Sequence, residues 1–102
     1  MTIELKIHPD APGERVEVYD QDLITIGRSP SCDVRFDLGA DLDVSTRHAE
    51  ISRVDGRATI ADLESTNGTW VSDRRVTQAE IQNHDEFRVG RTRFMLIVTD
   101  PE

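Results

Sequence analysis

The sequence predicts an all-β fold, either a sandwich or a barrel, and three observations carry the prediction. Apolar and polar residues alternate with a period of two along most of the chain, which is the pattern of half-buried strands. Clusters of turn-forming residues recur about every 8 to 12 residues, a spacing typical of sandwiches and barrels. Helical patterns are scarce: the best candidate, TQAEIQ at residues 77–82, is too short to bury an apolar stripe, so we expect a loop there.

The alternation predicts the strands in order along the chain. Near the end, the apolar run over residues 93–98 (RFMLIV) predicts a strand that is covered on both faces or lies inside a sheet. The earlier strands are carried by the apolar positions Ile3, Leu5 and Ile7, Val16 and Val18, Ile24 and Ile26, Ala49 and Ile51, and Ala58 and Ile60. The turn clusters are PDAPGE, YDQD, RSPSCD, VDGR, STNG, SDRR and QNHD.

Length and composition favour one domain over residues 1–102. A chain of 102 residues buries roughly 60 to 70% of its unfolded surface without staples. Cys32 is the only cysteine, so no internal disulfide can form and we expect a reducing, cytoplasmic compartment. No apolar run has the length of a signal peptide or of a membrane-spanning helix, so we expect neither secretion nor a membrane partner.

The charge pattern argues against one class of partner and permits another. The formal net charge of −8 argues against a nucleic-acid partner, because such a protein needs a basic face to displace counterions from phosphates. Eleven of the twelve basic residues are arginine, whose planar fork of donors matches phosphate and carboxylate oxygens. The excess of arginine over lysine therefore permits recognition of an anion at one site. A compositional bias of the source genome is the alternative explanation.

No residue pattern predicts an enzyme or a cofactor site. Ser45 and His48, with Asp43 or Asp62, could be drawn as a nucleophile, a base and an orienting acid. Three residues apart in an extended segment, however, Ser45 and His48 point to opposite faces, and no nucleophile-elbow glycine pattern surrounds the serine. We therefore expect no catalysis. We also expect no metal and no cofactor, since there is no glycine-rich phosphate loop and no known ligand spacing among His8, His48, His84 and Cys32.

The segment DLESTNGTWV, residues 62–71, has three possible interpretations. Asn67-Gly68, between two segments that favour β structure, is a strong signal for a tight hairpin turn. Asn67-Gly68-Thr69 is also an acceptor triplet for N-glycosylation, which the expected reducing compartment disfavours. The third interpretation is a binding loop, since loops on a rigid scaffold often carry function.

Several turns carry short polar residues that can hold an anion. Arg28 follows Gly27 at the end of a predicted strand, and Ser45 and Thr46 supply hydroxyls after an acidic loop. The turn at residues 66–68 can point its backbone N–H groups together into a nest that attracts anions. Each feature alone is more typical of an ordinary surface or turn residue, but the loops of a sandwich cluster at its two ends and can meet in space.

Taken together, four segments resemble the forkhead-associated (FHA) domain over essentially the whole chain: IGRSPSCDV, VSTRHAEI, DLESTNGTWV and NHDEFRVGRTRFMLIV. The family pattern is Gly-Arg, then Ser-x-x-His, then Asn-Gly followed by Thr, each at a strand end. The resemblance implies a two-sheet antiparallel β-sandwich of about eleven strands, whose loops at one end bind phosphothreonine peptides. The positions that fill the pattern are Gly27-Arg28, Ser45 and His48, Asn67-Gly68-Thr69 and, at the last hairpin, Asp85 and Gly90.

The same resemblance implies a role for each residue at these loops. A phosphothreonine carries roughly −1.5 to −2 charges and three acceptor oxygens, so it needs a cationic fork and several neutral donors. The residues expected to bind the phosphate are Arg28, Ser45, Thr46 and Thr66. Those expected to bind the peptide are Asn67 and Arg47, and those expected to support the site are Gly27, His48 and Gly68. The implied partner is a phosphothreonine-containing protein, which in turn implies an upstream Ser/Thr kinase.

Some positions depart from the family pattern. Thr46 stands where many relatives have Arg, Lys or Asn, and Arg47 compensates only if its side chain points toward the ligand. His84 replaces the usual glycine at the last hairpin, so we expect a positive φ there. The acidic loop over residues 37–43 borders the expected site and is expected to select the residues that flank the phosphothreonine. Since the whole chain is acidic, basic flanks should be favoured.

A rival interpretation keeps the same sandwich but uses it as a phosphate-independent interaction or assembly domain. The missing charge at Thr46 and the overall acidity favour this rival. A comparison of one threonine peptide with and without its phosphate discriminates between the two. In either case we expect a monomer.

Overall fold

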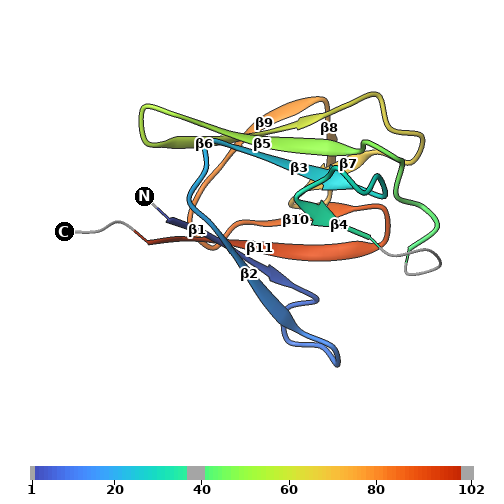
Figure 1. Ribbon diagram of the computed structural model, residues 1–102, viewed down its shortest axis with the longest axis horizontal. Coiled ribbons are helices and arrows are strands. Elements are labelled where there is room, and N and C mark those ends of the chain that lie inside the picture. Colours follow the sequence, from blue (N-terminus) through green and yellow to red (C-terminus); the bar gives the residue numbers. More distant parts are fainter. Residues whose placement is uncertain (1, 37–40, 100–102) are drawn as a thin grey trace.

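The computed structural model, which describes residues 2–36 and 41–99, consists of two β-sheets packed face to face (Figure 1). Its eleven strands confirm the predicted all-β sandwich, and no helix occurs in the described part of the chain. The strands are β1 (Thr2–Ile7), β2 (Arg15–Tyr19), β3 (Leu23–Gly27), β4 (Val34–Arg35), β5 (Ala49–Val54), β6 (Arg57–Asp62), β7 (Thr69–Val71), β8 (Arg74–Val76), β9 (Gln78–Ile81), β10 (Glu86–Val89) and β11 (Thr92–Thr99).

The strands divide between the sheets in an order that differs from their order in the chain. One sheet has six strands in the order β2-β1-β11-β10-β7-β8, and the other has five in the order β4-β3-β5-β6-β9. The pairs are antiparallel, as predicted, except that the two-residue strand β4 runs parallel to β3 and places Arg35 opposite Gly27. This short parallel pair lies at the end of β3.

The core lies between the sheets and is made by alternate side chains of the strands. On β1, Ile3, Leu5 and Ile7 are at most 1% exposed, and the residues between them face outward. In the six-stranded sheet, Phe87 and Phe94 stack with their ring centroids 4.9 Å apart. Burying each large apolar side chain stabilises the fold by about 1.5 to 3 kcal/mol. The two sheets are therefore a firm scaffold for the loops.

Two predicted strands form but bury less than their sequence suggests. β2 exposes Val16 and Val18 by 47% and 58%, because it is an edge strand and these side chains share the outer face with Lys6 and Glu4. β11 lies inside the six-stranded sheet, as one interpretation of its apolar run predicts. Only alternate side chains of β11 are buried, however, since the sandwich has two layers and leaves the outer face of each sheet uncovered.

The prediction of a loop at residues 77–82 is wrong for most of that segment. Gln78–Ile81 form β9, which pairs with β6 so that Ile81 lies opposite Ala58. Ile81 is only 2% exposed, and its burial stabilises the pairing. The segment is too short to show an alternation of its own, so the strand is fixed by a partner that lies far away in the sequence.

The prediction of a hairpin at Asn67-Gly68 is also wrong, although the chain does turn there. β6 and β7 belong to different sheets, so this turn carries the chain from one sheet to the other, with Gly68 at φ 89°. The tight two-residue hairpin lies at Ser72-Asp73, between β7 and β8, where both residues have positive φ as such turns require. His84 has φ 73°, as predicted for a position where relatives use glycine.

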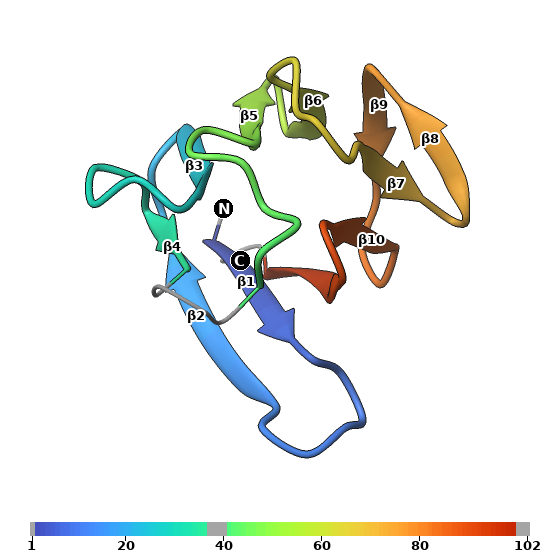
Figure 2. The ribbon, with the colours of Figure 1, turned by 90° about the vertical axis from the view of Figure 1, so that its right-hand side faces the viewer.

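The loops gather at one end of the sandwich, as predicted. Figure 2 looks onto this end, where β3 finishes and where β5 and β7 begin, so residues 28–33, 41–48 and 63–68 come together there. At the opposite end, Thr2 and Thr99 are paired across β1 and β11 (Figure 1). We call the first of these the loop end. Residues 37–40 of the acidic loop lie outside the described part of the chain.

Candidate functional site

A pocket of about 320 Å³ opens at the loop end. It brings together all four predicted phosphate-binding residues and the predicted peptide-binding Asn67. Its lining residues are Arg28, Leu42, Asp43, Val44, Ser45, Thr46, Thr66 and Asn67. Three loops that are distant in the sequence therefore contribute to one concave surface.

Arg28 is held at the pocket by its backbone and leaves its side chain available. Its N–H donates to the carbonyl oxygen of Ser45 (3.2 Å), and the N–H of Ser29 donates to the carbonyl oxygen of Thr46 (2.9 Å). The guanidinium makes no hydrogen bond or ion pair with the described residues. A half-buried arginine without a partner is a ready site for an anion.

Gly27 allows this close packing of the β3 end against the next loop. A Cβ built on Gly27 would lie 2.3 Å from the carbonyl oxygen of Thr46 and 3.1 Å from the Cα of Arg47. Both are backbone atoms, which cannot move aside as the end of a side chain can. The glycine is therefore required by proximity, whereas at Gly68 the positive φ requires it.

The polar side chains of the pocket are partly engaged and partly free. Ser45 Oγ accepts a hydrogen bond from the N–H of Thr66 (3.2 Å), so the hydroxyl proton of Ser45 remains available. Asn67 Nδ2 donates to the carbonyl oxygen of Asp43 (3.0 Å), which leaves its Oδ1 to accept a hydrogen bond. The Thr46 and Thr66 side chains are exposed. The pocket thus offers one cation and several neutral donors.

His48 links the two walls of the pocket from beneath. The imidazole is fully buried; its Nδ1 accepts a hydrogen bond from the N–H of Ser45 (3.0 Å), and its Nε2 lies 2.7 Å from the carbonyl oxygen of Gly68. These partners assign the proton to Nε2. Through these two bonds the ring connects the Ser45 loop to the Gly68 turn. It also bonds the backbone of Ser45 and not the hydroxyl, so no nucleophile and base pair forms.

Asp62 fixes the shape of the turn that holds Thr66 and Asn67. Its carboxylate accepts hydrogen bonds from Ser65 Oγ, from the N–H of Ser65 (3.1 Å) and from Thr69 Oγ1 (2.8 Å). Partial burial raises the pKa of Asp62, but the hydrogen bonds from Ser65 and Thr69, together with His48, outweigh it and hold the pKa below its ordinary value. The folded turn therefore favours the ionised carboxylate.

This arrangement predicts a loss of stability in acid. Because the pKa of Asp62 is lower in the folded chain, its contribution is present above the unfolded value of about 3.9 and is lost as the pH falls below it. Urea unfolding from pH 6 to pH 3 should show a shallower loss of stability for Asp62→Asn than for the unsubstituted chain over the lowest unit. Parallel curves for the two proteins would contradict the assignment.

Three features of the site were missed by the sequence analysis. Asp41 is 8% exposed and bonds the N–H of Asp43 (3.0 Å), the N–H of Arg91 (2.8 Å) and Thr92 Oγ1 (2.8 Å), so it pins the acidic loop to the β10–β11 hairpin. An aspartate that bonds the backbone two residues later is a known turn former, which is the only local signal for it. Leu42 and Val44, which line the pocket, carry no such signal.

Two arginines lie outside the pocket. Arg47 is exposed, is absent from the lining and lies beside Gly27. Arg91, at the β10–β11 hairpin, pairs its Nε with the carboxylate of Asp43 at 2.6 Å. The structure therefore places the predicted peptide-binding Arg47 next to the pocket and not within it.

Trp70 and Arg88 support the pocket from the outer face of the six-stranded sheet. Trp70 Nε1 donates to the carbonyl oxygen of Asn67 (3.3 Å), and the Arg88 guanidinium lies 4.8 Å from the centre of the Trp70 ring. Arg88 also donates to the carbonyl oxygen of Gly90 (2.9 Å). This cation–π pair therefore connects the Asn67 turn to the β10–β11 hairpin.

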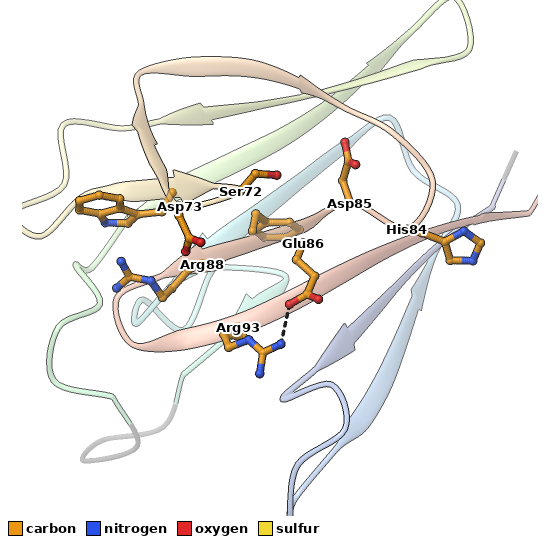
Figure 3. Close-up of a pocket in the computed structure, with 9 residues that line it drawn as sticks. Ser72, Asp73, His84, Asp85, Glu86, Arg88 and Arg93 are labelled. Carbon is orange, nitrogen blue, oxygen red and sulfur yellow. Dashed lines mark hydrogen bonds and ion pairs between the residues drawn. The ribbon is translucent and has the colours of Figure 1, made fainter.

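A larger cavity of about 430 Å³ on the same outer face is lined in part by this pair (Figure 3). Its acidic and basic side chains are mixed: Glu86 pairs with Arg93 at 2.6 Å, and Asp73 and Asp85 line the same space. It contains none of the predicted site residues and no concentration of one charge. The smaller pocket at the loop end is therefore the better candidate site.

Among residues 2–36 and 41–99, no group of three His, Cys, Asp or Glu side chains is placed to hold a metal ion. No helix in that part of the chain is long and apolar enough to cross a membrane.

Several curated proteins and one family model are similar to this chain in sequence. The model of the FHA domain family matches residues 24–90. The glycogen accumulation regulator GarA of Mycolicibacterium smegmatis is 36% identical over 85 residues, which cover 83% of this chain and 51% of GarA. An oxoglutarate dehydrogenase inhibitor of Corynebacterium diphtheriae is 36% identical over 80 residues, which cover 78% of this chain and 54% of that protein. The chain thus spans about half the length of the curated relatives it matches.

Solved structures agree with this fold over almost the whole chain. An FHA domain from a study of phosphothreonine-dependent FHA domain interactions matches with a TM-score of 0.85 and 28% identity, covering 99% of this chain and 100% of that one. The FHA domain of FhaA, solved in complex with the intracellular domain of another protein, matches with a TM-score of 0.80 and 30% identity, covering 92% and 98%.

Proposed function

Because the chain belongs to the FHA domain family, we propose that it binds phosphothreonine peptides at the loop end and so recruits a partner phosphorylated by a Ser/Thr kinase. One observation carries the proposal. Among the described residues, the guanidinium of Arg28 has no acidic partner, and its pocket also holds the side chains of Ser45, Thr46 and Thr66. An unpaired cation surrounded by neutral donors is what a dianionic phosphate requires.

Each side chain has a distinct task in this proposal. Arg28 presents its planar fork to two phosphate oxygens. Ser45 donates its free hydroxyl proton while its Oγ stays fixed by the N–H of Thr66, and the Thr46 and Thr66 hydroxyls complete the shell. Asn67 uses its free Oδ1 to accept an N–H of the peptide main chain beside the phosphothreonine.

The supporting residues act through the backbone. Gly27 allows the β3 end to approach Thr46, Gly68 allows the turn at positive φ, and His48 ties the two walls together. Because these contacts are made within the chain itself, they fix the shape of the site, and less free energy is lost in ordering it when the peptide binds.

In this proposal the chain is a binding module and has no catalytic role. The family assignment and the names of its relatives, a regulator and an inhibitor, support a non-catalytic module. We further propose that residues 1–102 act as one domain in the cytoplasm, where Ser/Thr kinases and a reduced Cys32 coexist.

The test compares one fluorescein-labelled threonine peptide with its phosphorylated form by anisotropy titration. Loss of two or more charge-assisted contacts, each of about 1.5 to 3 kcal/mol, should weaken binding of the unphosphorylated peptide by at least roughly 100-fold. Equal affinity for the two peptides would contradict the proposal and support the rival, a phosphate-independent assembly domain.

A further inference from the structure

The eleven arginines divide into two groups by their partners. Six side chains pair with a carboxylate or lie over the tryptophan: Arg15, Arg53, Arg57, Arg88, Arg91 and Arg93. Within the described part of the chain, the other five make no hydrogen bond, ion pair or ring contact with their side chains: Arg28, Arg35, Arg47, Arg74 and Arg75. Unpaired arginines on a chain of net charge −8 are unexpected, so their positions are informative.

Three of the unpaired arginines surround Gly27. Arg28 follows it in the chain, and Arg35 is its partner in the parallel β3–β4 pair. The Cα of Arg47 lies 3.1 Å from a Cβ built on Gly27. These residues lie on the side of the pocket formed by Arg28 and Thr46.

The remaining two lie on the other side, beside the Gly68 turn. Arg75 stands opposite Trp70 in the β7–β8 pair, and its Nε lies 2.6 Å from a Cβ built on Gly68. Arg74 directly precedes Arg75 in β8. Viewed onto the loop end, β4 and the β7–β8 hairpin lie on opposite sides of the loops (Figure 2). The pocket therefore lies between two sets of unpaired arginines.

Most of the carboxylates that the structure describes at the loop end already have partners of their own, so few are left to pair with these arginines. Asp33 accepts hydrogen bonds from Thr25, and Asp43 pairs with Arg91. Asp41 and Asp62 bond the donors described above. Glu64, which is exposed in the 62–68 turn, is the one carboxylate of that turn without a partner. Among the described residues around the loop end, guanidiniums without a partner therefore outnumber carboxylates without one.

We propose that the loop end selects acidic residues on both flanks of the phosphothreonine. Arg35 and Arg47 contact the flank on the Gly27 side, and Arg75, with Arg74, contacts the flank on the Gly68 side. The inference rests on the proposed phosphothreonine function and names its partner more closely, as a peptide whose phosphothreonine is set among Asp and Glu. It also reverses the preference for basic flanks that the total charge suggests.

The reversal follows from the range of electrostatic forces. At physiological salt the screening length is about 8 Å, so carboxylates elsewhere on the sandwich act weakly on a peptide at the loops. Unpaired guanidiniums within reach of the peptide are not screened in this way. Each exposed pair changes affinity by roughly 1.5- to 5-fold, and several flanking pairs together act multiplicatively.

The experiment uses three phosphothreonine peptides that differ only in their flanks, with Glu, Gln or Lys at the two positions on each side. The expected order of affinity is Glu, then Gln, then Lys, with at least roughly 5-fold between the extremes at 0.15 M salt and a larger ratio at 0.05 M. Peptides that carry Glu on a single side of the phosphothreonine show which flank each set of arginines contacts. Arg47→Gln should reduce the preference on one side and Arg75→Gln on the other.

Arg57→Gln is the matched control, because Arg57 is an exposed arginine on the β5–β6 hairpin, away from the loop end. It should leave the order and the ratios unchanged. Thermal unfolding of Arg47→Gln and Arg75→Gln should match that of the unsubstituted chain, since neither side chain has a partner to lose.

Two results separate this inference from the function on which it rests. Phosphate-dependent binding with equal affinities for the three flanks, or with the Lys peptide tightest, would overturn the flank preference alone. Equal binding of the Gln peptide with and without its phosphate would overturn the proposed function. Acidic preference that survives Arg47→Gln and Arg75→Gln together would also overturn the assignment to these arginines.

Discussion

Arg28→Ala should weaken binding of a phosphothreonine peptide by roughly 10- to 150-fold, which corresponds to the loss of about 1.5 to 3 kcal/mol from a charge-assisted contact. The size of the effect follows from the state of the side chain before binding. Arg28 has no acidic partner in the described part of the chain, so it breaks no ion pair when the phosphate arrives. Isothermal titration of both proteins with one phosphopeptide measures the change.

Two further variants separate charge from shape at this position. Arg28→Lys keeps the positive charge but loses the planar fork, so its affinity should lie between those of the alanine variant and the unsubstituted chain. Arg57→Ala, which removes an arginine from the β5–β6 hairpin, should change affinity by less than about 2-fold. Equal affinity of Arg28→Ala and the unsubstituted chain would remove Arg28 from the site.

His48→Ala should lower the free energy of unfolding by about 2 to 5 kcal/mol. The imidazole is fully buried, and its removal leaves a cavity and orphans the N–H of Ser45 and the carbonyl oxygen of Gly68. Each buried polar group without a partner costs roughly 1 to 3 kcal/mol. Urea unfolding followed by circular dichroism measures the change.

The control for this prediction is another histidine. His84 is exposed and has φ 73°, and asparagine tolerates that conformation, so His84→Asn should stay within about 0.5 kcal/mol of the unsubstituted chain. A similarly small effect for His48→Ala would contradict the tie between the two walls. Phosphopeptide binding by His48→Ala should weaken as well, because the Ser45 and Gly68 loops are no longer held in register.

The fold was largely predictable because its strands repeat one local rule. Alternation located the strands that carry Ile3, Ile24 and Ile51, since each buries every second side chain. It could not locate β9, whose four residues are fixed only by pairing with β6, nor tell which face of β2 the valines would take. Those outcomes depend on neighbours in space, and a single segment holds no information about them.

The candidate site was also predictable only in part. Gly27-Arg28, Ser45 and Asn67 follow one another in the order of the FHA pattern, and that resemblance predicted that they would meet in one pocket. The outward placement of Arg47 depends on how the chain enters β5, and the tie from Trp70 to Asn67 depends on side-chain geometry across a turn. Asp43 was considered only as a catalytic acid, yet its role is to hold Asn67 and Arg91.

The pairing of Thr2 with Thr99 has a practical consequence for how this molecule can be handled. Both residues lie at the end of the sandwich opposite the loops, on a body 40 Å long. An affinity tag, a surface linker or a fused reporter attached there would leave the pocket facing solution. The domain can thus be immobilised through either terminus and still present its binding face to a partner as large as a folded protein.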